Sequence, residues 1–121
     1  MKIIDNGTVT SPIGFFGAGG HAGIKKEKKD LALIYSQVDA KAVGTFTQNI
    51  VKAAPVLWDK MIVENYDHAR VIAINSGVAN ACTGDEGMKD NEEFAKSVAD
   101  NFSFEKEEVL ICSTGVIGKQ L

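Results

Sequence analysis

The stretch VLICSTGVIGKQL, residues 109–121, indicates the fold most directly. The run 108–114 is apolar and rich in strand formers, and it predicts a buried strand. Ser113, Thr114 and Gly115 are small residues that predict a turn where this strand ends. A second apolar run, ARVIAIN at 69–75, is followed by SGVANACTGDEG, which predicts another buried strand that ends in a long loop.

Two helices are predicted upstream of these strand ends. In 91–102, apolar residues recur at helical spacing, and they are Phe94, Ala95, Val98, Ala99 and Phe102. Asp90 is predicted to be the N-cap of this helix, and Glu93 completes a pattern like a capping box. The segment 53–65 predicts the other helix, because Pro55 suits the first turn of a helix.

Two further apolar segments, 30–36 and 42–47, predict strands that are paired or adjacent. Strands and helices therefore alternate along the chain, which predicts an α/β or α+β fold with a mixed sheet layered with helices. The chain has 121 residues, of which 45% are hydrophobic, so we expect one domain, 1–121, with a modest core.

Composition and charge exclude several classes of partner. The chain has 13 basic and 16 acidic residues and a net charge of -3, which gives no electrostatic reason to expect nucleic acid or an anionic membrane. No apolar stretch approaches the ~20 residues that span a bilayer. The start MKIIDNGTVTSP lacks the apolar segment of a secretory signal, so we expect a cytoplasmic protein.

Cysteine and histidine give no sign of a metal centre. Cys82 and Cys112 are far apart and form no C-x-x-C pair, so we expect reduced, buried thiols. His21 and His68 are isolated in the sequence, whereas a zinc site needs three or four converging ligands. The sequence therefore predicts no metal.

The glycine-rich stretch GAGGHAG, residues 17–23, fits the loose G-x-G-x-x-A pattern of dinucleotide-binding proteins, with Asp39 near the expected ribose-binding position. Its context argues against that function, because Pro12 and Gly14 interrupt the preceding segment and a charge run follows. A tight turn is the better interpretation. The charge run itself, KKEKKD at 25–30, predicts solvated surface, with a specific anion site as the less favoured alternative.

The loop NSGVANACTG, residues 75–84, allows two interpretations. Small and amide side chains directly after a buried strand can line a ligand crevice. Alternatively, its Asn and Ser side chains bond to nearby backbone and stabilise the loop. Cys82 is disfavoured as a nucleophile, because no base lies near it in the sequence.

Thr114 and Gly115 have a sharper chemical interpretation. A Thr-Gly step beyond a strand can present a hydroxyl and an unshielded backbone N–H to the same point, as a developing oxyanion on an acyl group requires. An ordinary exit from a strand into a turn is the alternative.

Four blocks of this chain, in this order, resemble the ornithine acetyltransferase family, also called glutamate N-acetyltransferase or the bifunctional arginine-biosynthesis acetyltransferase. They are GIKKEKKDLALIYS (23–36), VGTFTQNIVKAAPV (43–56), INSGVANACTG (74–84) and CSTGVIGKQL (112–121). The match covers most of the chain from Phe15 onward, and the blocks together are highly specific. Val78 departs from the pattern, because we expect a polar or small residue there.

The resemblance implies a self-processing fold of which these residues form the amino-terminal portion of the first (alpha) chain. It implies acetyl transfer from N-acetylornithine to glutamate through an acetyl-enzyme, without a cofactor, although some members accept acetyl-CoA as a substrate. In the family the precursor cuts itself in two, and the threonine that starts the second (beta) chain is the nucleophile. That threonine lies outside this sequence, whereas Thr114 and Gly115 match the oxyanion hole.

The implied partners are the rest of the first chain, the second chain and the two substrates, within a hetero-oligomer of two chain types. We expect this chain alone to be inactive and to expose apolar surface that the rest of the enzyme covers. Two other functions stay open. The first is a non-catalytic binding or scaffold module of the same fold. The second is a part of a self-processing aminopeptidase.

Overall fold

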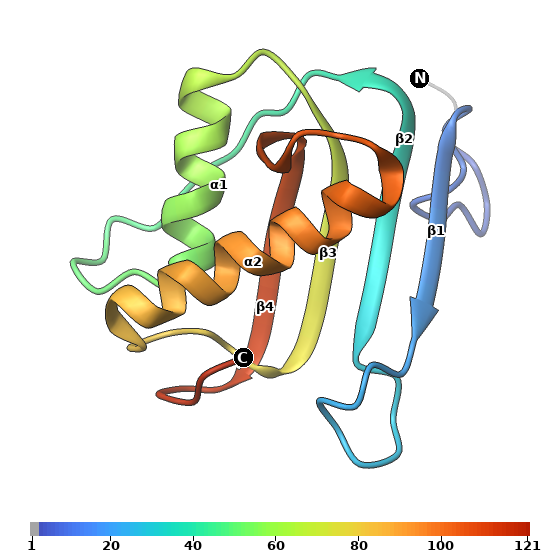
Figure 1. Cartoon of the computed structure of the whole chain (residues 1–121). Helices are drawn as coiled ribbons and strands as arrows, with labels where there is room; N and C mark the ends of the chain where they lie inside the picture. Colours follow the sequence, from blue (N-terminus) through green and yellow to red (C-terminus); the bar gives the residue numbers. More distant parts are fainter. Residues whose placement is uncertain (1–2) are drawn as a thin grey trace.

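A computed structural model describes residues 3–121 and contains one four-stranded sheet (Figure 1). Strands β1 to β3 pair antiparallel in chain order, whereas β3 and β4 are parallel. The strands are β1 (Phe15–Gly20), β2 (Leu31–Ala40), β3 (Ala69–Val78) and β4 (Val109–Val116). This mixed sheet, with helices packed on it, confirms the predicted fold class.

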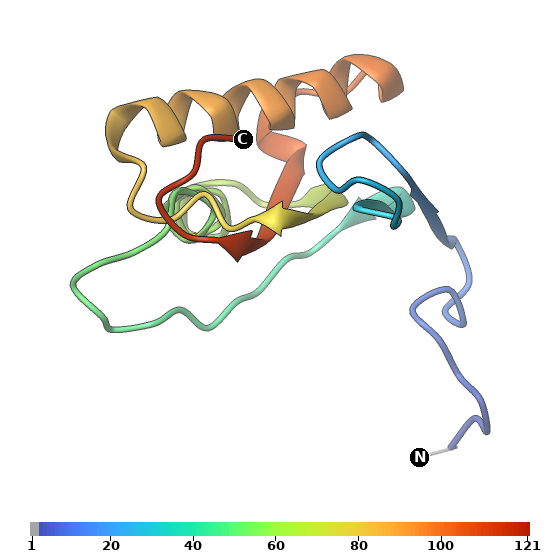
Figure 2. The same ribbon diagram turned by 90° about the horizontal axis from the view of Figure 1, so that it is seen from below.

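Two α-helices complete the fold: α1 (Ala54–Asn65) and α2 (Gly84–Phe102). A short 3-10 helix, η1 (Lys106–Glu108), leads into β4. Helix α2 lies on one face of the sheet and provides the crossover that a parallel pair of strands needs (Figure 2). The core between sheet and helices consists of Trp58, Ile62, Val71, Ala73, Ala95, Val98, Ala99, Val109 and Ile111.

Helix α1 packs along the free edge of β4. The Trp58 indole Nε1–H donates to the Val109 carbonyl oxygen at 2.9 Å, and the Ile111 N–H donates to Asp59 Oδ1 at 2.8 Å. Side chains of α1 therefore satisfy edge groups of β4 that would otherwise be open to another strand.

The face of the sheet opposite α2 carries no helix. Ile34, Ile72 and Leu110 lie half-buried on this helix-free face and line a pocket with Val43. The segment between β2 and α1 passes on this side (Figure 2). Val43 in that segment is 86% exposed. Apolar surface is thus exposed here, as we expected.

The predicted strand at 42–47 is wrong, because this segment has no regular secondary structure. A strand needs a free neighbouring edge, and β2 already pairs with β1 on one side and β3 on the other. Its strand-forming residues are instead largely exposed.

The predicted tight turn at 17–23 is wrong for its first half. Gly17 and Gly19 lie in β1, where they pair with Ile34 and Ala32. Backbone hydrogen bonds hold β1 to β2 and need no particular side chains. The glycine-rich sequence of β1 therefore shows little of the side-chain pattern that predicts a strand. The turn begins after β1, where Gly23 has a positive φ of 91°.

Helix α2 begins earlier than predicted, at Gly84, and Thr83 rather than Asp90 is its N-cap. Asp90 lies within the helix, so the predicted cap is wrong. Gly87 explains the error, because an added Cβ there would lie 2.5 Å from Asn80 Oδ1. A glycine that close packing requires looks, in the sequence, like a helix breaker.

The structure differs from the sequence predictions at two further points. Strand β4 continues through Val116, so Thr114 and Gly115 lie within the strand and not in a turn. Cys82 and Cys112 are free, as expected, but both are exposed rather than buried.

Neither α-helix in residues 3–121 has the length and apolar composition that crossing a bilayer requires.

Candidate functional site

Thr114 and Gly115 are exposed near the end of β4 and lie opposite Ser76 and Gly77 of β3. Side chains alternate between the two faces of a strand. Ile111 is buried against the helices, so the Thr114 side chain lies on the opposite, helix-free face. The structure therefore leaves the Thr114 hydroxyl accessible.

The alternation of strand β4 indicates that the backbone N–H of Gly115 is directed away from β3. In β4, the Val109 carbonyl oxygen and the Ile111 N–H face α1, since both bond to its side chains. Gly115 shares the alternation of these two residues, so its N–H lies on the same edge of the strand. Thr114 and Gly115 are consecutive and exposed, so this hydroxyl and this N–H lie near each other at the end of β4.

Gly115 lies against the backbone of Gly77. An added Cβ at Gly115 would lie 2.2 Å from the Gly77 carbonyl carbon and 2.6 Å from the Val78 nitrogen. Gly115 also has φ +138°, a conformation that side chains disfavour. Only glycine fits this position, where the Gly115 backbone packs closely against β3.

Gly77 is packed in turn against the loop that joins β1 to β2. Its φ is +128°, and an added Cβ would lie 2.7 Å from Ile24 Cγ2. The pairing of β3 with β4 is irregular at Gly77 and Val78. The buried Asn75 side chain spans this irregularity, because its Nδ2 donates to the Val78 carbonyl oxygen at 2.8 Å.

Asp30 holds the loop 21–30 in place. Its carboxylate is buried and accepts the N–H groups of Ala22 at 2.5 Å and Lys25 at 2.7 Å. These backbone hydrogen bonds, and secondarily the His21 charge, keep the pKa of Asp30 below its ordinary value. The Ser76 N–H donates to the Asp30 carbonyl oxygen at 2.8 Å, which joins the loop to β3.

The prediction that 25–30 is solvated surface is therefore wrong at both ends. Asp30 is 2% exposed, and the half-buried Lys25 donates from Nζ to Ser76 Oγ at 2.5 Å. A run of charges in the sequence does not reveal which of its members bond to a distant strand. The Lys25–Ser76 contact joins residues 51 positions apart, so no local pattern could have identified it.

The loop after β3 is stabilised by its own side chains, which supports the second interpretation of 75–84. Asn80 Nδ2 donates to the Gly87 carbonyl oxygen at 2.8 Å, and the Thr83 hydroxyl donates to Asn80 Oδ1 at 2.7 Å. Val78 is buried at 2% exposure, so it has a packing role. Although Cys112 is exposed as a residue, desolvation of its thiol, followed by the nearby Asp59 charge, raises the pKa of Cys112, which disfavours a thiolate nucleophile there.

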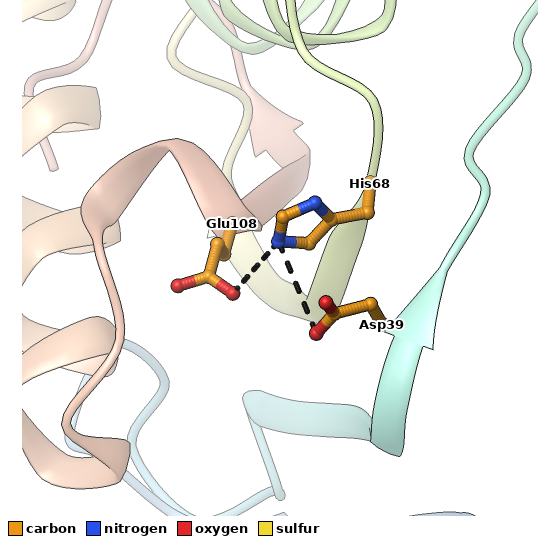
Figure 3. A group of neighbouring side chains, drawn as sticks. All are labelled: Asp39, His68 and Glu108. Atoms are coloured by element: carbon orange, nitrogen blue, oxygen red, sulfur yellow. Dashed lines mark hydrogen bonds and ion pairs between the residues drawn. The ribbon is translucent and has the colours of Figure 1, made fainter.

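A second group of polar side chains lies at the other end of the sheet, where Asp39, His68 and Glu108 come together (Figure 3). His68 Nε2 is 3.1 Å from Glu108 Oε1 and 3.9 Å from Asp39 Oδ1. The sequence reasoning missed this group, because its members come from β2, the residue before β3 and η1.

Arg70 makes this group a poor cation site. Its Nη1 lies 3.2 Å from the same Asp39 oxygen that faces His68, and the other Glu108 oxygen accepts the Glu105 N–H. The Arg70 guanidinium also lies over the Phe104 ring, with 4.4 Å from Cζ to the ring centroid. This network ties together the ends of three elements, and its carboxylates already have partners.

Comparison with known proteins shows which family this sequence resembles. The profile of the ArgJ family matches residues 17–121. The arginine biosynthesis bifunctional protein ArgJ of Caldanaerobacter subterraneus subsp. tengcongensis is 52% identical over the whole chain, and that of Thermotoga neapolitana is 50% identical over 91% of it. The chain spans 30% and 28% of the length of these two relatives.

Two solved structures share the fold. The ArgJ protein of Bacillus halodurans superposes with a TM-score of 0.92 at 36% identity, over 98% of this chain and 62% of that one. The ornithine acetyltransferase of Mycobacterium tuberculosis, solved in complex with ornithine, has a TM-score of 0.89 at 45% identity, over 93% of this chain and 62% of that one.

Proposed function

Because this chain belongs to the ArgJ family, we propose that it supplies the amino-terminal part of an acetyltransferase of arginine biosynthesis. The acetyl group moves from N-acetylornithine to glutamate. The observation that carries this proposal is the exposed pair of donors, Thr114 and Gly115, held at the end of β4 by the contact between Gly115 and Gly77. The relative solved with ornithine supports the substrate class.

In the proposed mechanism, a threonine hydroxyl from outside these residues attacks the acetyl carbonyl of N-acetylornithine. The carbonyl oxygen gains negative charge, and the Thr114 hydroxyl and Gly115 N–H donate hydrogen bonds to it. The C–N bond then breaks, the amine leaves with the proton from the threonine, and an acetyl ester remains. The amine of glutamate attacks this ester in the reverse sense and releases the threonine.

The proposal includes partners and a location. The nucleophile and the rest of the fold come from the remaining part of the first chain and from a second chain, in a hetero-oligomer within the cytoplasm. No cofactor takes part, and acetyl-CoA is a possible second acetyl donor. The 121 residues alone contain no complete site and are expected to be inactive.

The test uses a chimera in which these 121 residues replace the matching part of the Caldanaerobacter relative. We expect acetyl transfer from N-acetylornithine to glutamate, and Thr114→Ala should reduce turnover by about 10²- to 10³-fold, the usual effect of losing one oxyanion donor. Thr114→Ser keeps a hydroxyl and should retain most of the turnover. Thr45→Ala, at another exposed threonine, is the matched control.

Near-normal turnover of Thr114→Ala would remove Thr114 from the mechanism. A folded chimera that transfers no acetyl group would reject the proposed function. In that case, hydrolysis of peptide substrates would indicate an aminopeptidase, and inactivity toward both would indicate a binding or scaffold module. Expressing the two parts as separate chains repeats the test if the fusion does not fold.

A further inference from the structure

We propose that the Lys25 ammonium binds the α-carboxylate of the amino-acid substrate beside Thr114 and Gly115. This inference rests on the proposed acetyl transfer and adds the residue that recognises the substrate. Lys25 belongs to the charge run 25–30 in the sequence, but in the structure its side chain reaches the candidate site.

The first observation is where the ammonium lies. Lys25 Nζ donates to Ser76 Oγ at 2.5 Å, and Ser76 lies directly opposite Thr114 in the parallel β3–β4 pair. Directly opposed residues of adjacent strands have side chains on the same face, and adjacent strands are about 4.8 Å apart. The ammonium therefore lies beside the residue of β3 that faces Thr114.

The second observation is that the lysine is held in this position. An added Cβ at Gly77 would lie 3.4 Å from Lys25 Cγ and 3.7 Å from its Cε, so the lysine stem lies over Gly77. The backbone N–H of Lys25 donates to the buried Asp30 carboxylate at 2.7 Å. Both ends of the residue are thus anchored, and binding a substrate requires little further ordering of the side chain.

The third observation is that the charge is available. An ammonium has three donors, and Ser76 Oγ takes one of them. Within residues 3–121, Lys25 forms no ion pair, as is also true of most other lysines, including the half-buried Lys52. Lys25 differs from these lysines because its ammonium bonds to the strand residue opposite Thr114. A half-buried cation without an anionic partner favours a ligand that brings a carboxylate.

The geometry of the substrate fits this spacing. Glutamate has a single amine, on its α carbon, so three bonds separate the acetyl carbonyl carbon from the α-carboxylate carbon in the acetylated product. Each of these bonds is about 1.3–1.5 Å long. With the acetyl oxygen at Thr114 and Gly115, the α-carboxylate can lie over the neighbouring strand β3, where Lys25 bonds to Ser76.

The experiment compares lysine variants in the chimera described above. Lys25→Met keeps the apolar stem and removes the charge, Lys25→Arg keeps the charge, and Lys26→Met is a control at an exposed neighbour. We expect Lys25→Met to raise the KM for glutamate about tenfold or more, the typical effect of losing a charged hydrogen bond, with a smaller change in kcat. Lys25→Arg should have an intermediate KM, and Lys26→Met should match the unmodified chimera.

Two substrate analogues identify the carboxylate. Glutamate 1-amide lacks the α-carboxylate, and glutamine lacks only the side-chain carboxylate. We expect the unmodified chimera to use glutamate 1-amide far less well than glutamate, and Lys25→Met to lose this discrimination. Discrimination against glutamine should be the same in both proteins, because Lys25 is not assigned to that end of the substrate.

An unchanged KM in a folded Lys25→Met variant, confirmed by its thermal melting curve, would overturn this inference and leave the proposed function intact. So would a fall in kcat with KM unchanged, which would place Lys25 at the reacting oxygen instead. Lys25→Gln provides the same measurements if Lys25→Met does not fold. A folded but inactive unmodified chimera would instead reject the proposed function itself.

Discussion

Gly115 lies closer to a neighbouring backbone than any residue with a side chain could lie. We predict that Gly115→Ala lowers the free energy of unfolding by about 3 kcal/mol, because the new methyl group overlaps Gly77 and φ is unfavourable. Gly118→Ala should cost about 1 kcal/mol, because Gly118 also has a positive φ but has open space around it. Urea unfolding of the 121-residue chain measures both values.

Equal losses in the two glycine variants would mean that φ alone matters and that β3 does not fix the position of Gly115. In the chimera, we also expect Gly115→Ala to reduce turnover more than Gly118→Ala, because only Gly115 contributes a donor N–H to the proposed site. Comparing the two variants thus separates the close packing of Gly115 from its backbone conformation.

At the scale of single residues, the sequence predicted which groups are chemically useful but not which neighbours hold them. Thr114 and Gly115 could be selected because a hydroxyl and a bare N–H follow a strand. The contacts of Gly77 with Ile24 and of Lys25 with Ser76 arise only when distant segments meet. Nothing in the local sequence distinguishes Lys25 from the exposed lysines next to it.

At the scale of elements, Asp59 couples helix α1 to the edge of β4. Its burial raises its pKa from 3.8 to about 6, although the hydrogen bond from the Ile111 N–H acts in the opposite direction. Between these two pH values, the folded chain binds more protons than the unfolded chain does. Stability from this group is therefore fully present below about pH 4 and is lost as the pH rises through about 6.

We predict that Asp59→Asn removes this contribution to the pH dependence. The amide oxygen of asparagine can still accept the Ile111 N–H, and asparagine does not ionise. The difference in unfolding free energy between Asp59→Asn and the unmodified chain should therefore move in favour of the variant from pH 4 to pH 7. Denaturant unfolding at several pH values measures this difference, with Asp67→Asn as an exposed control. A difference that is constant with pH would contradict the raised pKa.

Elements with a strong side-chain pattern were predicted well. The two buried strands and the centre of both helices carry apolar residues at the right spacing, and all four were found. The strand β1 was missed because glycine and alanine give no pattern, and 42–47 was predicted as a strand because propensity says nothing about whether a free edge exists. Close packing of Gly87 hid the first turns of α2 in the same way.

At the scale of the whole molecule, the helix-free face determines how the isolated chain behaves in solution. Ile34, Ile72 and Leu110 line this face, and Val43 beside it is largely exposed. We predict that the 121-residue chain self-associates as its concentration rises, because association buries apolar surface. Sedimentation velocity measures this, and a monomer at all concentrations would contradict the prediction.

The matched control for this prediction is the chimera. If the rest of the family's chain covers the same apolar surface, then joining it should suppress the association of this part. A chimera that aggregates as the isolated chain does would show that the helix-free face stays open. The control therefore distinguishes apolar surface that the rest of the enzyme covers from apolar surface that stays exposed in the complete enzyme.

The clamp that Asp30 places on the connection between β1 and β2 has a practical consequence for protein engineering. Surface loops usually tolerate insertions, epitope tags and circular permutation. Here extra residues between His21 and Asp30 would displace Ile24 from Gly77 and leave the glycine pair without its support. Labels and new termini should be introduced elsewhere, for example in the exposed segment 47–51.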